Sequence, residues 1–285
     1  MTVFDDNEKT QQHVLSYDKI LKRTLSQDDD LTIRFMNGLL SEEIPLGTSV
    51  VWLDKETIHE KYVGIVSDFY PRIGGNLYHI ELESDAYDSE DIAVRMFKYN
   101  VGGAIAHNMS SSKYSLDISF PKSCVIYLKS GKSTPKTIQW NISFFNGQKT
   151  ELQVPVISLE NMSVEDMADN CLFPIGQFYL RTFDPLSNKK IDAFKATAEL
   201  LIAKLEEAVS KNEIPLHIAI EMQDIIRKTA ENTIIRSGKE IKLDIDEKFV
   251  ETLPWIDFAP LIAEFEERKK EEGRQEGSLK KLNAI

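Results

Sequence analysis

The spacing of hydrophobic residues predicts a first half that mixes helices and strands. Residues 16–25 and 31–39 place apolar side chains at helical intervals, with Gly38 and Pro45 as stop signals. The runs at 50–53, 62–70 and 76–84 are rich in β-branched and aromatic residues and are separated by turn residues, which is typical of strands. The sequence therefore predicts two short helices followed by three strands.

Helical spacing returns over residues 89–107, although Gly102 and Gly103 each weaken a helix by about 1 kcal/mol relative to alanine. We expect a close contact between helix and sheet at these glycines. Strand-like runs follow after Ser112, and the last two flank Asn146-Gly147. This dipeptide between alternating runs predicts a β-hairpin.

From Ser163 onward the spacing is helical only, with helices expected at 163–181, 190–211 and 216–236. We place a boundary near Asp184-Pro185. This division gives an α/β domain over residues 1–186, in which 1–15 have no apolar period and are expected to be flexible, and a helical region over 187–285 with a charged tail. The apolar stripes of the two long helices serve either homo-oligomer assembly or the covering of the sheet.

Composition excludes some classes of function but does not identify one. The chain has 285 residues with 34 basic and 46 acidic side chains, for a net charge of −12, which argues against broad nonspecific adhesion to nucleic acid but allows a local basic surface. No apolar stretch approaches the roughly 20 residues that span a membrane. The polar N-terminus and the two cysteines favour a cytoplasmic location and no membrane partner.

Carboxylates gather on the strands joined by Gly74-Gly75. If these glycines form a two-residue turn, facing residues have numbers that sum to 149, so Asp68 faces Glu81. Side chains alternate along a strand, so Glu81, Glu83 and His79 share one face. Like charges at this spacing destabilise the pair unless a cation intervenes, and carboxylates are ligands that Mg²⁺ prefers. A solvent-exposed acidic strand face is the alternative interpretation.

Several motifs resemble the PD-(D/E)XK nuclease superfamily, and more narrowly the Rpn group of recombination-promoting nucleases or putative transposases. Asp68 is followed after twelve residues by Glu81-Leu82-Glu83, and then by Arg95 and Tyr99 in RMFKY. The likeness extends to YDKILKRTL, RFMNGLL, YHIELES, FPKSCVIYL and VPVISLENMSVEDM, and to EEGRQEG in the tail. It implies a restriction-endonuclease-like mixed β-sheet flanked by helices, a helical C-terminal region, and DNA cleavage that depends on Mg²⁺ (or Mn²⁺).

One residue departs from the family pattern. Members usually have Gln or Lys where this chain has Glu83. A lysine there would help to activate water and offset phosphate charge, whereas Glu83 acts only as a further metal ligand or as a base. We therefore carry two hypotheses: a DNA endonuclease with Asp68, Glu81 and Glu83 as catalytic metal ligands, or a degenerate nuclease fold that binds DNA or a protein partner.

Other candidate residues lie near these acids or on the first helix. Arg95 and Tyr99 are four apart and thus share a helix face; the resemblance places them beside the acids, with a structural ion pair as the alternative. His79 reaches the metal or is simply a packed strand histidine. Lys19, Lys22 and Arg23 sit within one helical turn and contact the DNA backbone or form a solvated face.

Overall fold

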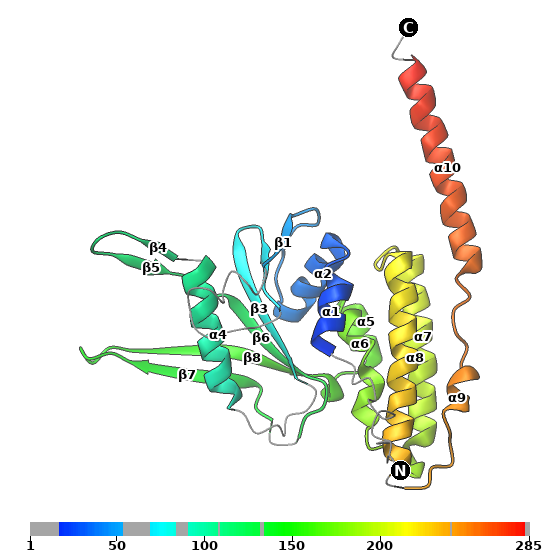
Figure 1. The fold of residues 1–285 in the computed structure, drawn as a ribbon, viewed down its shortest axis with the longest axis horizontal. Coiled ribbons are helices and arrows are strands. Elements are labelled where there is room, and N and C mark those ends of the chain that lie inside the picture. Colours follow the sequence, from blue (N-terminus) through cyan, green and yellow to red (C-terminus); the bar gives the residue numbers. More distant parts are fainter. Residues whose placement is uncertain are drawn as a thin grey trace, which may run out of the picture.

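The computed structural model describes residues 17–53, 69–83, 91–107, 109–131, 134–239 and 241–282. These residues form a mixed α/β structure in which a twisted sheet stands beside a layer of long helices (Figure 1). The hydrophobic pattern predicted an α/β part followed by a helical part, and the mixed α/β fold class is confirmed. No helix among the described residues is both long and apolar enough to cross a membrane.

The larger sheet has six strands in the order β1-β2-β3-β6-β8-β7. Its strands are β1 (Val50–Trp52), β2 (Pro71–Ile73), β3 (Asn76–Glu83), β6 (Lys122–Tyr127), β7 (Thr137–Ser143) and β8 (Lys149–Ser158). Strands β3, β6 and β8 run parallel, whereas β1, β2 and β3 are joined antiparallel and β7 is antiparallel to β8. A separate hairpin consists of β4 (Met109–Ser111) and β5 (Leu116–Ile118).

The turn between β2 and β3 has the register that the sequence predicts. Arg72 pairs with Leu77 and Ile73 pairs with Asn76, so facing numbers sum to 149. Gly74 and Gly75 have φ angles of 54° and 88°, a conformation that favours glycine. Most of the strand predicted at 62–70, including Asp68, lies outside the described residues.

Nine α-helices and three short 3-10 turns lie among the described residues. They are α1 (Tyr17–Leu25), α2 (Asp29–Leu40), α4 (Ile92–His107), α5 (Val164–Asp169), α6 (Phe173–Gly176), α7 (Ile191–Ser210), α8 (Leu216–Gly238), α9 (Lys248–Glu251) and α10 (Ala259–Leu282), with short 3-10 turns η1 (Leu159–Asn161), η2 (Tyr179–Phe183) and η3 (Asn188–Lys190). Helix α4 crosses from the end of β3 towards β4. The pair α7 and α8 matches the two long helices predicted from the spacing.

Alternation along the strands separates two clusters of buried residues. Ile80 of β3 and Ile126 of β6 belong to a large apolar core that they share with α1, α2, α5, α6, α7 and α8. Val125 and Tyr127 of β6 face the other way and pack with Met96 of α4 in a smaller cluster. The sheet is therefore covered by α4 on one face, and its other face contributes to the core that it shares with α1, α2, α5, α6, α7 and α8.

The large core continues across the boundary that we placed near Asp184-Pro185. Leu201 of α7 and Met222 of α8 are fully buried in the same cluster as Leu21 of α1 and Ile80 of β3. Of the two roles considered for the stripes on the long helices, covering the core of the first half is the one visible in this chain.

Two local predictions were wrong. The helix expected at 163–181 is broken into α5, α6 and η2, because Cys171 takes a left-handed φ of 57° that ends a helical run. Gly38 does not end a helix but lies inside α2, which continues to Leu40. A side chain at Gly38 would collide with the backbone after α5, since its Cβ would lie 1.8 Å from the carbonyl oxygen of Asn170.

Candidate functional site

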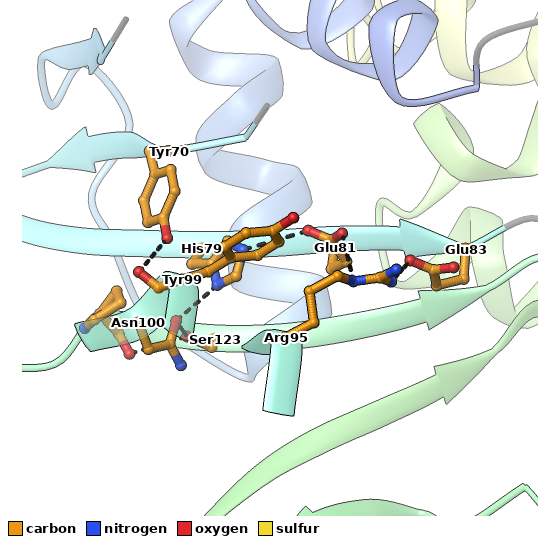
Figure 2. Close-up of polar contacts among 9 residues, drawn as sticks. Tyr70, His79, Glu81, Glu83, Arg95, Tyr99, Asn100 and Ser123 are labelled. Carbon is orange, nitrogen blue, oxygen red and sulfur yellow. Dashed lines mark hydrogen bonds and ion pairs between the residues drawn. The ribbon is translucent and has the colours of Figure 1, made fainter. Parts of the chain in front are cut away.

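The candidate site lies where the polar face of β3 meets α4. Glu81 and Glu83 project from this face near the carboxyl end of the strand, and His79 precedes them on the same side (Figure 2). Their neighbours Ile80 and Leu82 point into the large apolar core. The shared face that alternation predicts is therefore present. In sheets with parallel strands the carboxyl ends are the usual place for bound ligands.

Arg95 of α4 connects the two carboxylates. Its Nε atom lies 3.4 Å from Glu81 Oε1, and its Nη2 atom contacts Glu83 Oε1 (Figure 2). The three side chains are between 16% and 19% exposed, so this ion pair is largely desolvated but still open to solvent. One guanidinium thus offsets part of the repulsion that two neighbouring carboxylates create.

His79 is fully buried behind Glu81. Its ring stacks on Tyr70 with centroids 4.6 Å apart and meets the edge of Tyr99 at 5.7 Å. Its Nδ1 atom lies 2.7 Å from Asn100 Oδ1, while Nε2 faces Glu81 Oε2 at 3.4 Å. His79 is therefore a packed strand histidine, one of the two alternatives considered for it, and its Nε2 atom faces a carboxylate of the site.

A buried polar network holds the histidine in place. Ser123 of β6 donates from Oγ to Asn100 Oδ1 at 2.9 Å, and the Tyr70 hydroxyl donates to the carbonyl oxygen of Tyr99 at 2.7 Å. Burial, and after it the charge of Glu81, raises the pKa of Tyr70 above its ordinary value of 10.0. Tyr70 is therefore a neutral hydrogen-bond donor near the carboxylate.

The structure joins some of the predicted site residues and separates others. Arg95 and Tyr99 share the helix face that points to β3, as their spacing predicts. The lysines and arginine of α1 lie elsewhere: Leu21 of α1 packs with Ile80 in the large core, on the face of β3 opposite to Glu81. Arg23 there forms an ion pair with Glu221 at 3.2 Å, and Lys19 is exposed. Lys22 is partly buried on the same helix.

The carboxylates of the site are donors of the kind that Mg²⁺ prefers. Within the described part of the chain, no group of three His, Cys, Asp or Glu side chains is arranged to hold a metal. Asp68, the third predicted ligand, lies outside the described residues. Mg²⁺ is commonly bound by one or two carboxylates together with water and phosphate oxygens, so Glu81 and Glu83 fit this ion by the chemistry of their oxygens.

Three supporting residues were not predicted from the sequence. Asn100 and Ser123 are separated by 23 positions and meet only because α4 packs over β6, so local spacing holds no signal for them. Tyr70 has one indirect signal in Gly103. A Cβ at this glycine would lie 2.8 Å from Tyr70 Cε1, which is the close contact between helix and sheet expected from the glycine pair.

The chain was compared with models of protein families, with curated proteins and with solved structures, and none of them matched.

Proposed function

We propose that this protein is a metal-dependent endonuclease that hydrolyses phosphodiester bonds in DNA. The observation that carries the proposal is the pair Glu81 and Glu83, which project from one face at the carboxyl end of β3 and share the guanidinium of Arg95. The resemblance to the PD-(D/E)XK superfamily, and to its Rpn group linked with recombination, supports the same reaction and a restriction-endonuclease-like fold.

Each residue of the site has a role in this proposal. Glu81 and Glu83, together with Asp68, would hold Mg²⁺ or Mn²⁺ by their carboxylates. When bound, such an ion lowers the pKa of water and stabilises charge on phosphate. In this proposal Arg95 supplies the positive charge that a lysine at position 83 would bring, and it contacts a phosphate oxygen of the substrate. His79 keeps Glu81 in position.

Cleavage of supercoiled plasmid tests the proposal. We expect nicked and linear products with Mg²⁺ or Mn²⁺ and none with EDTA. Glu81→Gln removes a ligand charge at nearly constant volume and should slow cleavage by about a hundredfold or more. Glu199→Gln is the matched control, because Glu199 is an exposed acid on α7, away from the candidate site, and it should cleave like the parent. Equal rates for the parent and Glu81→Gln, across metals and salt, would contradict the proposal.

A second candidate function is favoured by one observation. Arg95 already offsets the charge of Glu81 and Glu83 without a metal, as expected of a nuclease fold that has lost activity and now binds DNA or a protein partner. This function predicts binding that survives both EDTA and Glu81→Gln. Cleavage that requires metal and Glu81 would exclude it.

A further inference from the structure

Charge is distributed unevenly between two parts of this acidic chain. Residues 92–158, which run from α4 to the end of β8, contain eight basic and only two acidic residues, for a net charge of +6. The rest of the chain contains 26 basic and 44 acidic residues, for a net charge of −18. A basic segment within a protein that is otherwise strongly acidic indicates a partner that is itself a polyanion.

The same segment forms two hairpins that extend beyond the body of the molecule. The hairpins β4-β5 and β7-β8 both project past α4, on the side away from α7 and α8 (Figure 1). Every residue from 109 to 118 is exposed, so the β4-β5 hairpin covers no core. A two-stranded hairpin alone is only marginally stable in water, which makes a structural role in the fold a poor explanation for it.

Aromatic residues stand at the tips of both hairpins. Tyr114 at the turn of β4-β5 is 88% exposed, and Phe145 at the turn of β7-β8 is fully exposed, with Phe144 beside it at 48%. Aromatic side chains are enriched at binding interfaces, so rings at the tips of two projecting hairpins are candidates for a contact surface. Rings on a basic arm are suited to stack on nucleic-acid bases.

Lysines accompany these rings. Lys113 lies next to Tyr114, with its Nζ atom 5.1 Å from the ring centroid, and Lys149 begins β8 close to the other tip. Lys98 on α4 and Lys136 before β7 are also exposed. Among the described residues, none of these four lysines forms an ion pair with a carboxylate, so their charges remain available to phosphate groups.

We infer that the β4-β5 and β7-β8 hairpins, together with the exposed side of α4, form the DNA-binding surface of this protein. The choice of DNA rests on the proposed function, and the charge of residues 92–158 supports a polyanion independently. Lysines contact the phosphate backbone, and Tyr114 and Phe145 stack on bases or insert between them. Arg95 lies on the face of α4 that points to β3, so DNA lying along the exposed side of this helix passes beside the candidate site. This surface is distinct from the α1 residues Lys19, Lys22 and Arg23.

The test measures DNA binding apart from cleavage. Fluorescence anisotropy of a labelled duplex and of a labelled single strand is recorded with the full chain in EDTA, over a series of salt concentrations. We expect the double variant Lys113→Glu with Lys149→Glu to bind about tenfold more weakly, and the slope of log Kd against log salt to fall by about 1.8 for two lost phosphate contacts on a duplex. The matched control is Lys189→Glu with Lys190→Glu, two exposed lysines of η3, which should bind like the parent.

A second variant tests the rings. Tyr114→Ser with Phe145→Ser keeps the charge and should weaken binding, most strongly to the single strand, where bases are accessible. All substituted side chains are exposed, so equal melting temperatures establish that the variants are folded. The inference is overturned if the parent binds neither DNA, or if the Lys113→Glu, Lys149→Glu variant binds as tightly as the control. Loss of binding in that variant, without any plasmid cleavage by the parent, supports the DNA-binding surface and contradicts the nuclease proposal alone.

Discussion

The two faces of β3 differ in almost every property. On one face Tyr78, Ile80 and Leu82 are buried in the large apolar core beneath α1 and α2. On the other face His79, Glu81 and their neighbours lie under α4, among polar partners. The apolar face stabilises the fold by removing hydrocarbon from water, whereas the polar face must satisfy each buried donor and acceptor individually.

This difference indicates which face serves function. Bringing Glu81 and Glu83 together beneath a helix costs stability, because their like charges repel and their desolvation is only partly offset by Arg95. An apolar pair at these positions would stabilise the sheet more simply. Local arrangements that oppose stability are expected mainly at functional sites, and this one coincides with the carboxyl end of a parallel strand.

The largest expected loss of stability follows from a substitution in α2, one of the helices on the apolar face of β3. Gly38→Ala places a methyl group 1.8 Å from the carbonyl oxygen of Asn170, and this backbone atom cannot rotate away. We expect the free energy of unfolding to fall by about 3 kcal/mol in urea titrations. Gly238→Ala is the control, since no atom lies within 4 Å of the new Cβ; it should change stability by about 1 kcal/mol at most, and in the favourable direction. Equal stability of the two variants would mean that α2 and the end of α5 are not in close contact.

A smaller loss of stability is expected when the polar face of β3 loses the guanidinium of Arg95. Arg95→Met leaves Glu81 and Glu83 without the guanidinium between them, which should lower the free energy of unfolding by about 2 kcal/mol at neutral pH. Adding Glu83→Gln should recover part of this loss, and a double-mutant cycle measures the coupling. If the site binds metal, Mg²⁺ should stabilise Arg95→Met by about 2.7 kcal/mol at a free concentration a hundredfold above its Kd. Additive effects of the two substitutions would show that Arg95 and Glu83 do not interact.

The contact between α4 and the sheet provides the next test. Gly103→Ala brings a Cβ to 2.8 Å from Tyr70 Cε1, so the helix must move outward. The better helix propensity of alanine offsets part of the strain, and we expect a net loss of about 1 kcal/mol. Because Tyr70 stacks on His79, we expect the rate of DNA cleavage to fall even though the variant remains folded. Thermal melts and plasmid assays on the same sample measure stability and cleavage. An unchanged cleavage rate would mean that Tyr70 does not support the candidate site.

The smallest effect concerns alkaline pH. The pKa of Tyr70 is raised in the folded protein by burial and by Glu81. The stability that depends on its neutral form is therefore complete below the unfolded pKa of about 10 and is lost as pH rises above that value. Tyr70→Phe cannot ionise, so the parent should lose stability relative to it by less than about 1 kcal/mol at half a pH unit above 10. Parallel curves of unfolding free energy against pH for the two proteins would contradict this assignment.

Much of the local structure was predictable because it depends on neighbours in the chain. The register around Gly74-Gly75 follows from the turn alone, and the Asn146-Gly147 turn between β7 and β8 follows from the same kind of signal. The long helices α7 and α8 were predicted from their apolar spacing. The broken segment after Ser163 was not, because its end depends on the left-handed conformation of Cys171, a residue that does not often adopt it.

The candidate site likewise has features that the sequence predicts and features that it does not. Alternation along β3 is a property of any strand, so the sequence by itself determined that His79, Glu81 and Glu83 share a face, and the four-residue spacing of Arg95 and Tyr99 determined that they share another. Only the tertiary structure decided that these two faces meet. The crossover from β3 through α4 to β6 brings Arg95 onto both glutamates and places Asn100 between His79 and Ser123. Contacts of this kind depend on how a helix packs on a sheet, and local periodicity does not contain that information.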